Sequence, residues 1–143
     1  MNARHIFIEY TQAIDRGDIS AAAALVHDSF RLEGAGLDGI GKAEFVAAMK
    51  AQLEAFPDYS ENPTDIREEG DKVYFVAHVS GTQKHTLTLP GMSPLGATGR
   101  SIHLPPEPAW VQVRDSRILI YHVDEVAGGG VKGILSQLGW SWG

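Results

Sequence analysis

Two titratable residues near the C-terminal end of the sequence are the first candidates for acid–base catalysis. His122 and Asp124 lie in an apolar, β-rich run that begins at Arg117. Because successive side chains of a strand alternate between its two faces, residues two apart point the same way. A carboxyl group in an apolar pocket has a raised pKa and can act as a general base, and a histidine beside it can relay the proton. We therefore predict that Asp124 and His122 are catalytic if their face lines a pocket. On an outer face they would form a solvated polar patch or part of a subunit interface.

Further candidates lie on other predicted elements. His103, in an earlier predicted strand, is a third predicted catalytic residue, with a hydrogen-bonded structural role as the alternative. Glu107 is bracketed by prolines, which form a rigid bulge that either aims its carboxyl group into a cavity or only blunts a sheet edge. Phe45 and Met49 belong to an apolar helical stripe that forms core or lines the mouth of a cavity. The predicted ligand contacts are His78, Glu107, Trp110, Phe45 and Met49.

Two other kinds of site are not expected. Three histidines and Asp124 are metal-ligand types, but the HExxH pattern is missing, and we predict no metal site. The glycine-rich stretches 38–42 and 128–133 lack the spacing of a phosphate-binding loop, which argues against nucleotide binding.

Composition narrows the class of protein. With 143 residues the chain is expected to form one domain, spanning residues 1–143. It has no cysteine, which excludes disulfides and thiol catalysis. The net charge of −6 without a Lys/Arg cluster argues against nucleic acid as a partner. No apolar run approaches the roughly 20 residues of a membrane span and no signal-like segment is recognised, so we expect a cytoplasmic protein without a membrane partner.

Hydrophobic periodicity predicts helices first and strands second. Helices are expected over 3–15, 19–26 and 42–56, the last one stopped by Pro57. Strands are expected over 30–33, 59–67, 72–83, 100–104, 108–114 and 118–126, and a last helix over 131–138. This order indicates an α+β fold, with helices packed on one face of a curved antiparallel sheet.

The order of elements and several short segments resemble those of a known family. The segments are Gly70-Asp71-Lys72-Val73, Gly81-Thr82, Leu87-Thr88-Leu89-Pro90-Gly91, Thr98-Gly99-Arg100, Arg114-Asp115-Ser116-Arg117-Ile118 and Gly133-Ile134-Leu135-Ser136-Gln137-Leu138-Gly139. Taken in this order, they resemble the SnoaL-like polyketide cyclase (ester cyclase) group of the NTF2-like superfamily.

The resemblance implies a sheet curled around a cone-shaped cavity, with helices closing its wide end. It also implies an aspartate as acid/base, without a metal or cofactor. We therefore expect cyclase- or isomerase-type chemistry on an apolar, carbonyl-containing small molecule, in a homodimer. The alternatives are a non-catalytic protein that binds a hydrophobic ligand and a dimeric interaction domain, because a fold does not determine a function.

The chain departs from the family pattern at the end of its last predicted strand. Relatives often have an aspartate just before the last helix, and Val126 falls on that position. Either Asp124 has taken over its role or the usual acid is missing. Beyond the last helix, Trp140 and Trp142 are expected to cover the pocket entrance or a dimer partner, or to belong to a frayed tail.

Overall fold

The structure, a computed structural model, describes residues 2–34, 39–89 and 92–140. Four helices lie within these residues. They are α1 (Ala3–Asp15), α2 (Ile19–Ala24), α3 (Lys42–Ala55) and α4 (Gly130–Gln137). Each lies where the sequence predicts a helix, within about two residues at each end. Asp18 caps α2, as expected, by accepting a hydrogen bond from the Ala21 amide at 3.0 Å. None of the described helices is both long enough and apolar enough to cross a membrane.

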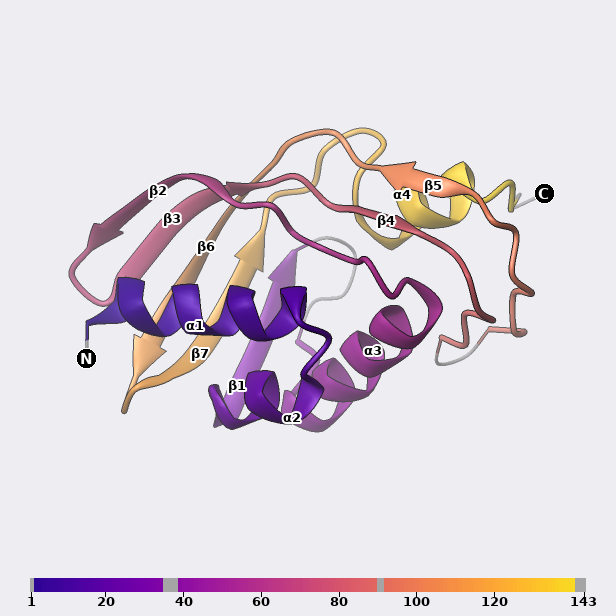
Figure 1. The fold of residues 1–143 in the computed structure, drawn as a ribbon. Helices are drawn as coiled ribbons and strands as arrows, with labels where there is room; N and C mark the ends of the chain where they lie inside the picture. The colour runs from indigo at the N-terminus through magenta and orange to yellow at the C-terminus, as the bar shows by residue number, and fades with distance from the viewer. Residues whose placement is uncertain (1, 35–38, 90–91, 141–143) are drawn as a thin grey trace.

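Five strands form a mixed, curved sheet in the order β1-β7-β6-β3-β2 (Figure 1). They are β1 (Val26–Gly34), β2 (Thr64–Glu69), β3 (Lys72–Ala77), β6 (Glu107–Arg114) and β7 (Arg117–Val123). The expected α+β architecture is confirmed, but β1 pairs with β7 in the parallel direction, so the sheet is not entirely antiparallel. The strand predicted over 30–33 is also longer than expected.

The ladder between β3 and β6 ends at the pair Ala77 and Glu107, and a break follows it. β4 (Ser80–Thr82) and β5 (Ser101–His103) form a separate two-stranded sheet beyond the break. The strand predicted over 72–83 is therefore two strands. Pro105 and Pro106 lie at the break between β5 and β6, because a proline has no amide hydrogen to donate to a ladder. Glu107 is the first residue of β6 after this break.

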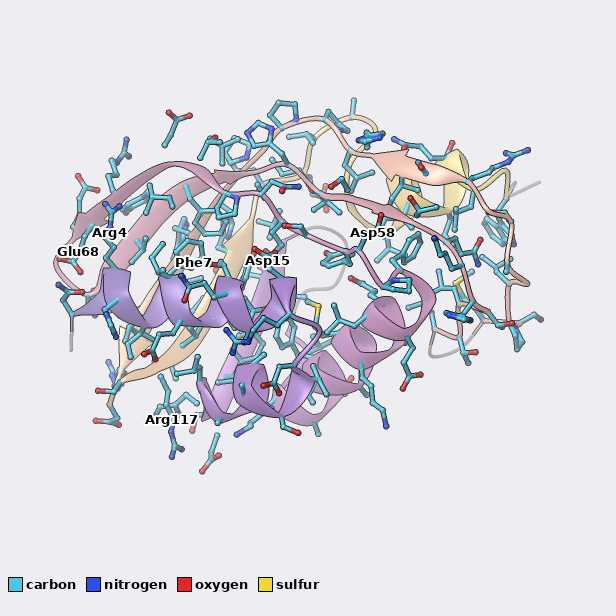
Figure 2. The ribbon with its side chains drawn as sticks, in the orientation of Figure 1. Arg4, Phe7, Asp15, Asp58, Glu68 and Arg117 are labelled. Carbon is cyan, nitrogen blue, oxygen red and sulfur yellow. The ribbon has the colours of Figure 1, made fainter. Side chains whose placement is uncertain are left out.

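Helix α1 crosses the concave face of the sheet and closes the core (Figure 1). Its buried stripe includes Ile6, Phe7, Tyr10 and Ile14, as the sequence predicts. Figure 2 shows Phe7 pointing from α1 toward the sheet, where its ring centroid lies 4.4 Å from that of Phe75. At the start of α1, the Arg4 amide donates to the Glu68 carboxyl group on β2 at 2.7 Å. The concave face is thus the covered face.

A β-bulge in β7 decides which of its side chains face inward. Gln112 pairs with Ile120 and Val113 with Ile118, which leaves Leu119 as an extra residue. Ile118 is fully buried and Tyr121, three residues later, also faces inward. Strict alternation would place Ile118 on the same face as His122, but the bulge shifts the alternation by one residue and separates them.

Candidate functional site

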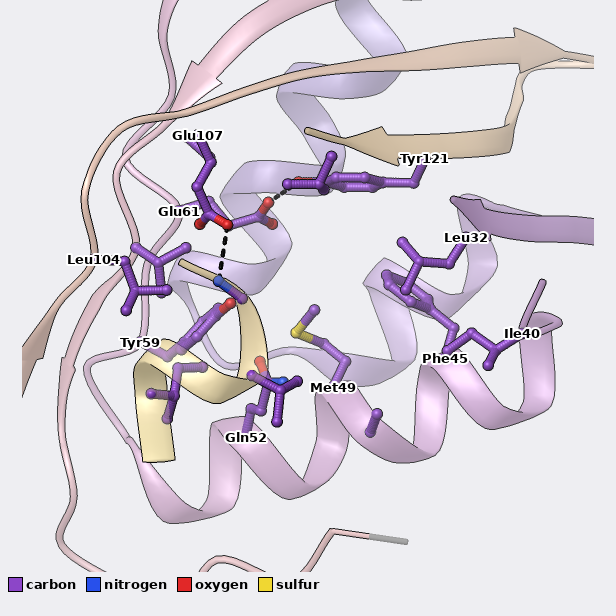
Figure 3. Close-up of a pocket in the computed structure, with 17 residues that line it drawn as sticks. Leu32, Ile40, Phe45, Met49, Gln52, Tyr59, Glu61, Leu104, Glu107 and Tyr121 are labelled. Carbon is purple, nitrogen blue, oxygen red and sulfur yellow. Dashed lines mark hydrogen bonds between the residues drawn. The ribbon is translucent and has the colours of Figure 1, made fainter. Parts of the chain in front are cut away.

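A pocket of about 110 Å³ lies between the concave face of the sheet, α3 and α4 (Figure 3). Most of its wall is apolar, and its polar side chains come from Gln52, Tyr59, Glu61, Glu107 and Tyr121. The apolar and glycine residues of the wall are Leu32, Ile40, Phe45, Ala48, Met49, Ala77, Val79, Leu104, Val123, Gly130, Val131 and Ile134. Such a cavity, apolar with a few convergent polar groups, is the usual form of a small-molecule site.

Glu61 is the most perturbed acid in the pocket. It lies between α3 and β2, where its carbonyl oxygen accepts a hydrogen bond from the His78 amide at 2.6 Å. Its side chain is buried, with Oε2 accepting a hydrogen bond from the Tyr121 hydroxyl. Its Oε1 is buried and has no hydrogen-bond partner among the described residues. Burial raises the pKa of Glu61 to about 7, the Tyr121 hydrogen bond opposes this rise, and the charges of Asp15 and Glu107 add to it.

Glu107 supplies a second carboxyl group to the same pocket. It is 4% exposed, and its Oε2 accepts a hydrogen bond from the Gly130 amide at 3.1 Å, where α4 begins. Burial raises the pKa of Glu107, and the hydrogen bond from Gly130 acts in the opposite direction. Figure 3 shows the Glu61 and Glu107 carboxyl groups close together. The charge of Glu107 therefore contributes to the raised pKa of Glu61.

Three buried tyrosines surround Glu61. Burial, together with the charge of Glu61, raises the pKa values of Tyr10, Tyr59 and Tyr121 well above the ordinary value. The phenols stay protonated at neutral pH, so Tyr121 acts as a hydrogen-bond donor to Glu61. The Tyr10 hydroxyl is buried without a hydrogen-bond partner among the described residues.

Helix α4 forms one wall of the pocket and is held by two contacts besides its apolar face. Its Gln137 side chain accepts from the His103 amide at 2.7 Å and donates to the His103 carbonyl at 2.8 Å. At the other end of the helix is the hydrogen bond between Gly130 and Glu107. The acid in the pocket is thus bonded directly to the helix that covers it.

Three of the predicted ligand-contact residues lie on the pocket wall. Phe45 and Met49 reach it from α3, and Glu107 from the start of β6. The proline-bracketed segment does direct the Glu107 carboxyl group inward. That these residues touch a ligand stays a prediction.

The predicted catalytic pair lies on the opposite face of the sheet. His122 and Asp124 do share a face, and His122 Nε2 lies 2.8 Å from Asp124 Oδ1. The described lining of the pocket contains the alternating neighbours Tyr121 and Val123 but neither member of the pair. The expectation that the pair lines the pocket is corrected here, because the alternation of β7 after its bulge turns His122 outward.

On that outer face, His122 takes part in a polar and aromatic cluster. Its ring stacks on Trp110 with centroids 5.2 Å apart, and its Nδ1 lies 3.4 Å from Glu33 Oε1. Trp110, a predicted ligand contact, is therefore also on the outer face.

The two other predicted histidines also lie outside the described lining of the pocket. The His78 side chain bonds to the Thr64 hydroxyl at 2.9 Å, and His103 is exposed on β5. Trp140 packs partly against the core, whereas Trp142 lies outside the described residues.

The sequence reasoning missed Glu61, Tyr59 and Tyr121. A signal for two of them was present: Tyr59 and Glu61 are two residues apart in a stretch predicted to be extended, and strand alternation places such residues on one face. Tyr121 could not be assigned to a face without knowledge of the bulge in β7.

Comparisons with known proteins agree with this geometry. A family profile described as a SnoaL-like domain matches residues 7–121. No curated protein gives a significant match. The solved structure of AclR from Streptomyces galilaeus, described as a candidate hydroxylase, is similar with 19% identity, a TM-score of 0.73, and coverage of 96% of this chain and 95% of that one.

Two further solved structures carry the description of candidate polyketide cyclases. The protein from Pseudomonas putida is 22% identical, with a TM-score of 0.69 over 96% of this chain and 98% of that one. The protein from Xanthomonas campestris is 26% identical, with a TM-score of 0.67 over 95% of this chain and 96% of that one. Since the profile covers most of the sequence and the fold agrees over nearly its whole length, the chain belongs to the SnoaL-like family, with the NTF2-like α+β cone.

Proposed function

We propose that the protein is an acid–base enzyme that acts on an apolar, carbonyl-containing small molecule in this pocket, with Glu61 as the group that transfers the proton. The observation that carries the proposal is the state of this carboxyl group, with one oxygen bonded to Tyr121, the other free, and a pKa raised to about 7. A general base is most effective when its pKa lies near the working pH. Independence from a cofactor is what the family resemblance implies.

The proposed reaction begins when the Glu61 carboxylate takes a proton from the carbon next to the ligand's carbonyl group. The electron pair of that C–H bond moves toward the carbonyl oxygen to form an enolate, and the Glu107 carboxyl group, when protonated, donates a hydrogen bond to that oxygen. In a cyclisation, the enolate carbon then attacks a second carbonyl group of the same molecule, and Glu61 returns the proton to the new alkoxide. In an isomerisation, Glu61 returns the proton to a different carbon.

The two glutamates could also take the role of the aspartate that the family pattern expects and this chain lacks. Val126 occupies the position expected for that acid. Glu61 and Glu107 bring carboxyl groups into the pocket from two other parts of the chain. We therefore assign the acid–base role to the glutamates rather than to Asp124.

Hydrogen–deuterium exchange tests this proposal without knowledge of the natural substrate. Acetophenone carries methyl protons next to a carbonyl group, and their exchange in D₂O is followed by proton NMR. We expect the protein to accelerate exchange and Glu61→Gln to reduce the acceleration at least about 100-fold, the lower range for general-base catalysis. The rate with the unaltered protein is expected to rise with pH through a midpoint near 7, as Glu61 loses its proton.

Two further variants make this experiment decisive. Glu69→Gln removes an exposed carboxyl group of the same type on β2 and serves as the matched control. Asp124→Asn tests the assignment made from the sequence. Lost exchange in Asp124→Asn with full exchange in Glu61→Gln would favour the pair on the outer face. Binding of acetophenone without any accelerated exchange would favour a non-catalytic binding protein.

We also propose that the protein is a homodimer joined through the outer face of the sheet. The proposal is supported by the half-buried aromatic rings of Tyr74 and Trp110, which pair across β3 and β6. Because their neighbours Val73, Phe75 and Val111 are buried on the covered face, these rings alternate onto the face that the helices leave uncovered (Figure 1). Apolar surface gathered on one face is typical of a contact between proteins.

A further inference from the structure

The pocket offers no positive charge to a ligand. Its two ionisable acids are Glu61 and Glu107, and none of the described lining residues is Lys, Arg or His. The sequence also has no basic side chain in the segments 35–38, 90–91 and 141–143. A ligand carboxylate or phosphate would therefore meet carboxyl groups in an apolar surrounding, where repulsion between like charges is stronger than in water.

The pocket does offer free hydrogen-bond acceptors. Glu61 Oε1 and Gln52 Oε1 are both buried and without a hydrogen-bond partner among the described residues. Figure 3 shows Gln52 on the α3 side of the pocket and Glu61 on the side of Tyr121. A buried acceptor without a partner is unfavourable. A ligand that brings a donor to it would remove this penalty.

The hydroxyl group of Tyr121 already donates a hydrogen bond within the protein. Its hydroxyl donates to Glu61 Oε2, so this group is not available to a ligand unless the pair separates. The Gly130 amide at the start of α4 is likewise bonded to Glu107. Ligand donors thus find partners in this pocket more readily than ligand acceptors do.

We infer that the pocket selects a ring-sized apolar molecule without negative charge, carrying a hydroxyl group that donates a hydrogen bond to Glu61 Oε1, and that it rejects carboxylates and phosphates. Because this ligand class is assigned to the pocket of the proposed enzyme, it rests on the proposed function. It specifies the charge and the hydrogen-bonding group of the apolar, carbonyl-containing substrate proposed above.

Single-ring probes are suited to a pocket of this size. A volume of about 110 Å³ is of the same order as that of an apolar cavity, roughly 150 Å³, that holds benzene. Phenol, toluene, benzoate and benzylammonium have similar shapes and differ in donor and charge. Dissociation constants would be measured by NMR titration of the full chain at pH 8. At this pH phenol is still uncharged and Glu61 is mostly ionised.

We expect phenol to bind about tenfold more tightly than toluene. Phenol can donate a hydrogen bond to the charged Glu61 carboxylate, whereas toluene has no donor, and a hydrogen bond to a charged acceptor is stronger than one between neutral groups. Benzoate should bind at least about tenfold more weakly than phenol. In Glu61→Gln the weakness of benzoate relative to phenol should shrink by at least about threefold, because the negative charge of Glu61 is removed. Glu69→Gln makes the same change in net charge on the exposed side of β2 and should leave both affinities unaltered.

Several results would overturn the inference. Phenol that binds no more tightly than toluene would remove the role of the hydroxyl donor. Benzoate that binds as tightly as phenol would remove the selection against anions, and benzylammonium that binds more tightly than phenol would show that an ammonium group, not a hydroxyl group, is the preferred donor. If Glu61→Gln does not fold, Glu107→Gln tests the same charge effect, and the four probes on the unaltered chain still decide.

The ligand class and the proposed reaction can fail separately. The expected order of affinities without deuterium exchange would support the ligand class and reject the enzyme. Exchange on acetophenone together with tight binding of benzoate would support the acid–base function and reject the ligand class.

Discussion

The Glu61 carboxyl group shows how one buried side chain links stability to chemistry. The group is buried, Tyr121 bonds to one of its oxygens, and no cation lies among the described residues that line its pocket. Burial favours the neutral acid and the hydrogen bond favours the carboxylate. Because burial has the larger effect, the group titrates near neutral pH, where it can both accept and return a proton.

The same perturbation makes the stability of the fold depend on pH. The pKa of Glu61 is about 7 in the folded protein, against 4.5 for the unperturbed side chain. The folded state therefore holds its proton more firmly than the unfolded state does. The stabilisation is fully present below the unfolded pKa and is lost as pH rises through the folded one. We expect Glu61 to lower the free energy of unfolding by about 3 kcal/mol across this window.

Chemical denaturation of the unaltered chain and Glu61→Gln at several pH values checks this expectation. The variant cannot titrate at this position, so its free energy of unfolding should fall less steeply between pH 4.5 and 7. Glu107, whose pKa burial also raises, contributes a slope of the same sign in both proteins. Parallel curves for the two proteins would contradict the assignment of a raised pKa to Glu61.

At the scale of the element, strand β7 shows where prediction from sequence succeeds and where it stops. Its position was predicted, because apolar runs are local signals, and Asp115 and Ser116 form the turn that joins it to β6. The bulge at Leu119 was not, because it depends on how β7 pairs with β6 and β1. One extra residue then exchanges the faces, so Tyr121 enters the pocket and His122 leaves it.

Helix α4 depends on a close approach that only glycine permits. A Cβ atom added to Gly133 would lie 2.1 Å from the Gly128 carbonyl oxygen, which belongs to the backbone and cannot move freely. We expect Gly133→Ala to push α4 away from the turn that precedes it and to cost about 1–3 kcal/mol of stability, as overpacking usually does. The displaced helix should also widen the pocket, because Val131 and Ile134 line it.

Amide hydrogen exchange and denaturation of Gly133→Ala test the role of this contact. Faster exchange in α4 and at His103, whose backbone is bonded to Gln137, is the expected result. Gly96→Ala is the matched control, because a Cβ atom there meets nothing within 4 Å and the backbone needs no positive φ. Equal stability of the two variants would show that the turn before α4 adapts to the added methyl group.

At the scale of the whole molecule, one sheet separates two different chemical surfaces. The concave face holds two carboxyl groups in an apolar pocket under α3 and α4, and the outer face carries aromatic rings with charged neighbours. The sequence predicted the α+β fold, the family and three lining residues, since these follow from order, periodicity and motifs. It could not predict the meeting of Glu61 with Glu107, because they are brought together by long-range backbone pairing, Glu61 with His78 and Glu107 with Ala77.

The outer face gives the last prediction, which concerns assembly. Lys72 Nζ lies 4.4 Å from the centroid of the Trp110 ring, which also stacks on His122, so the ring is held in place before any partner binds. A fixed, half-buried aromatic side chain on an uncovered sheet is the kind of residue that dominates protein contacts. We expect a dimer by sedimentation velocity and at least about a tenfold higher dissociation constant for Trp110→Lys. Ala47→Lys introduces the same charge on the exposed side of α3 and should leave the dimer intact. A monomer at every concentration of the unaltered chain, or an unweakened Trp110→Lys dimer, would rule out this face as the contact.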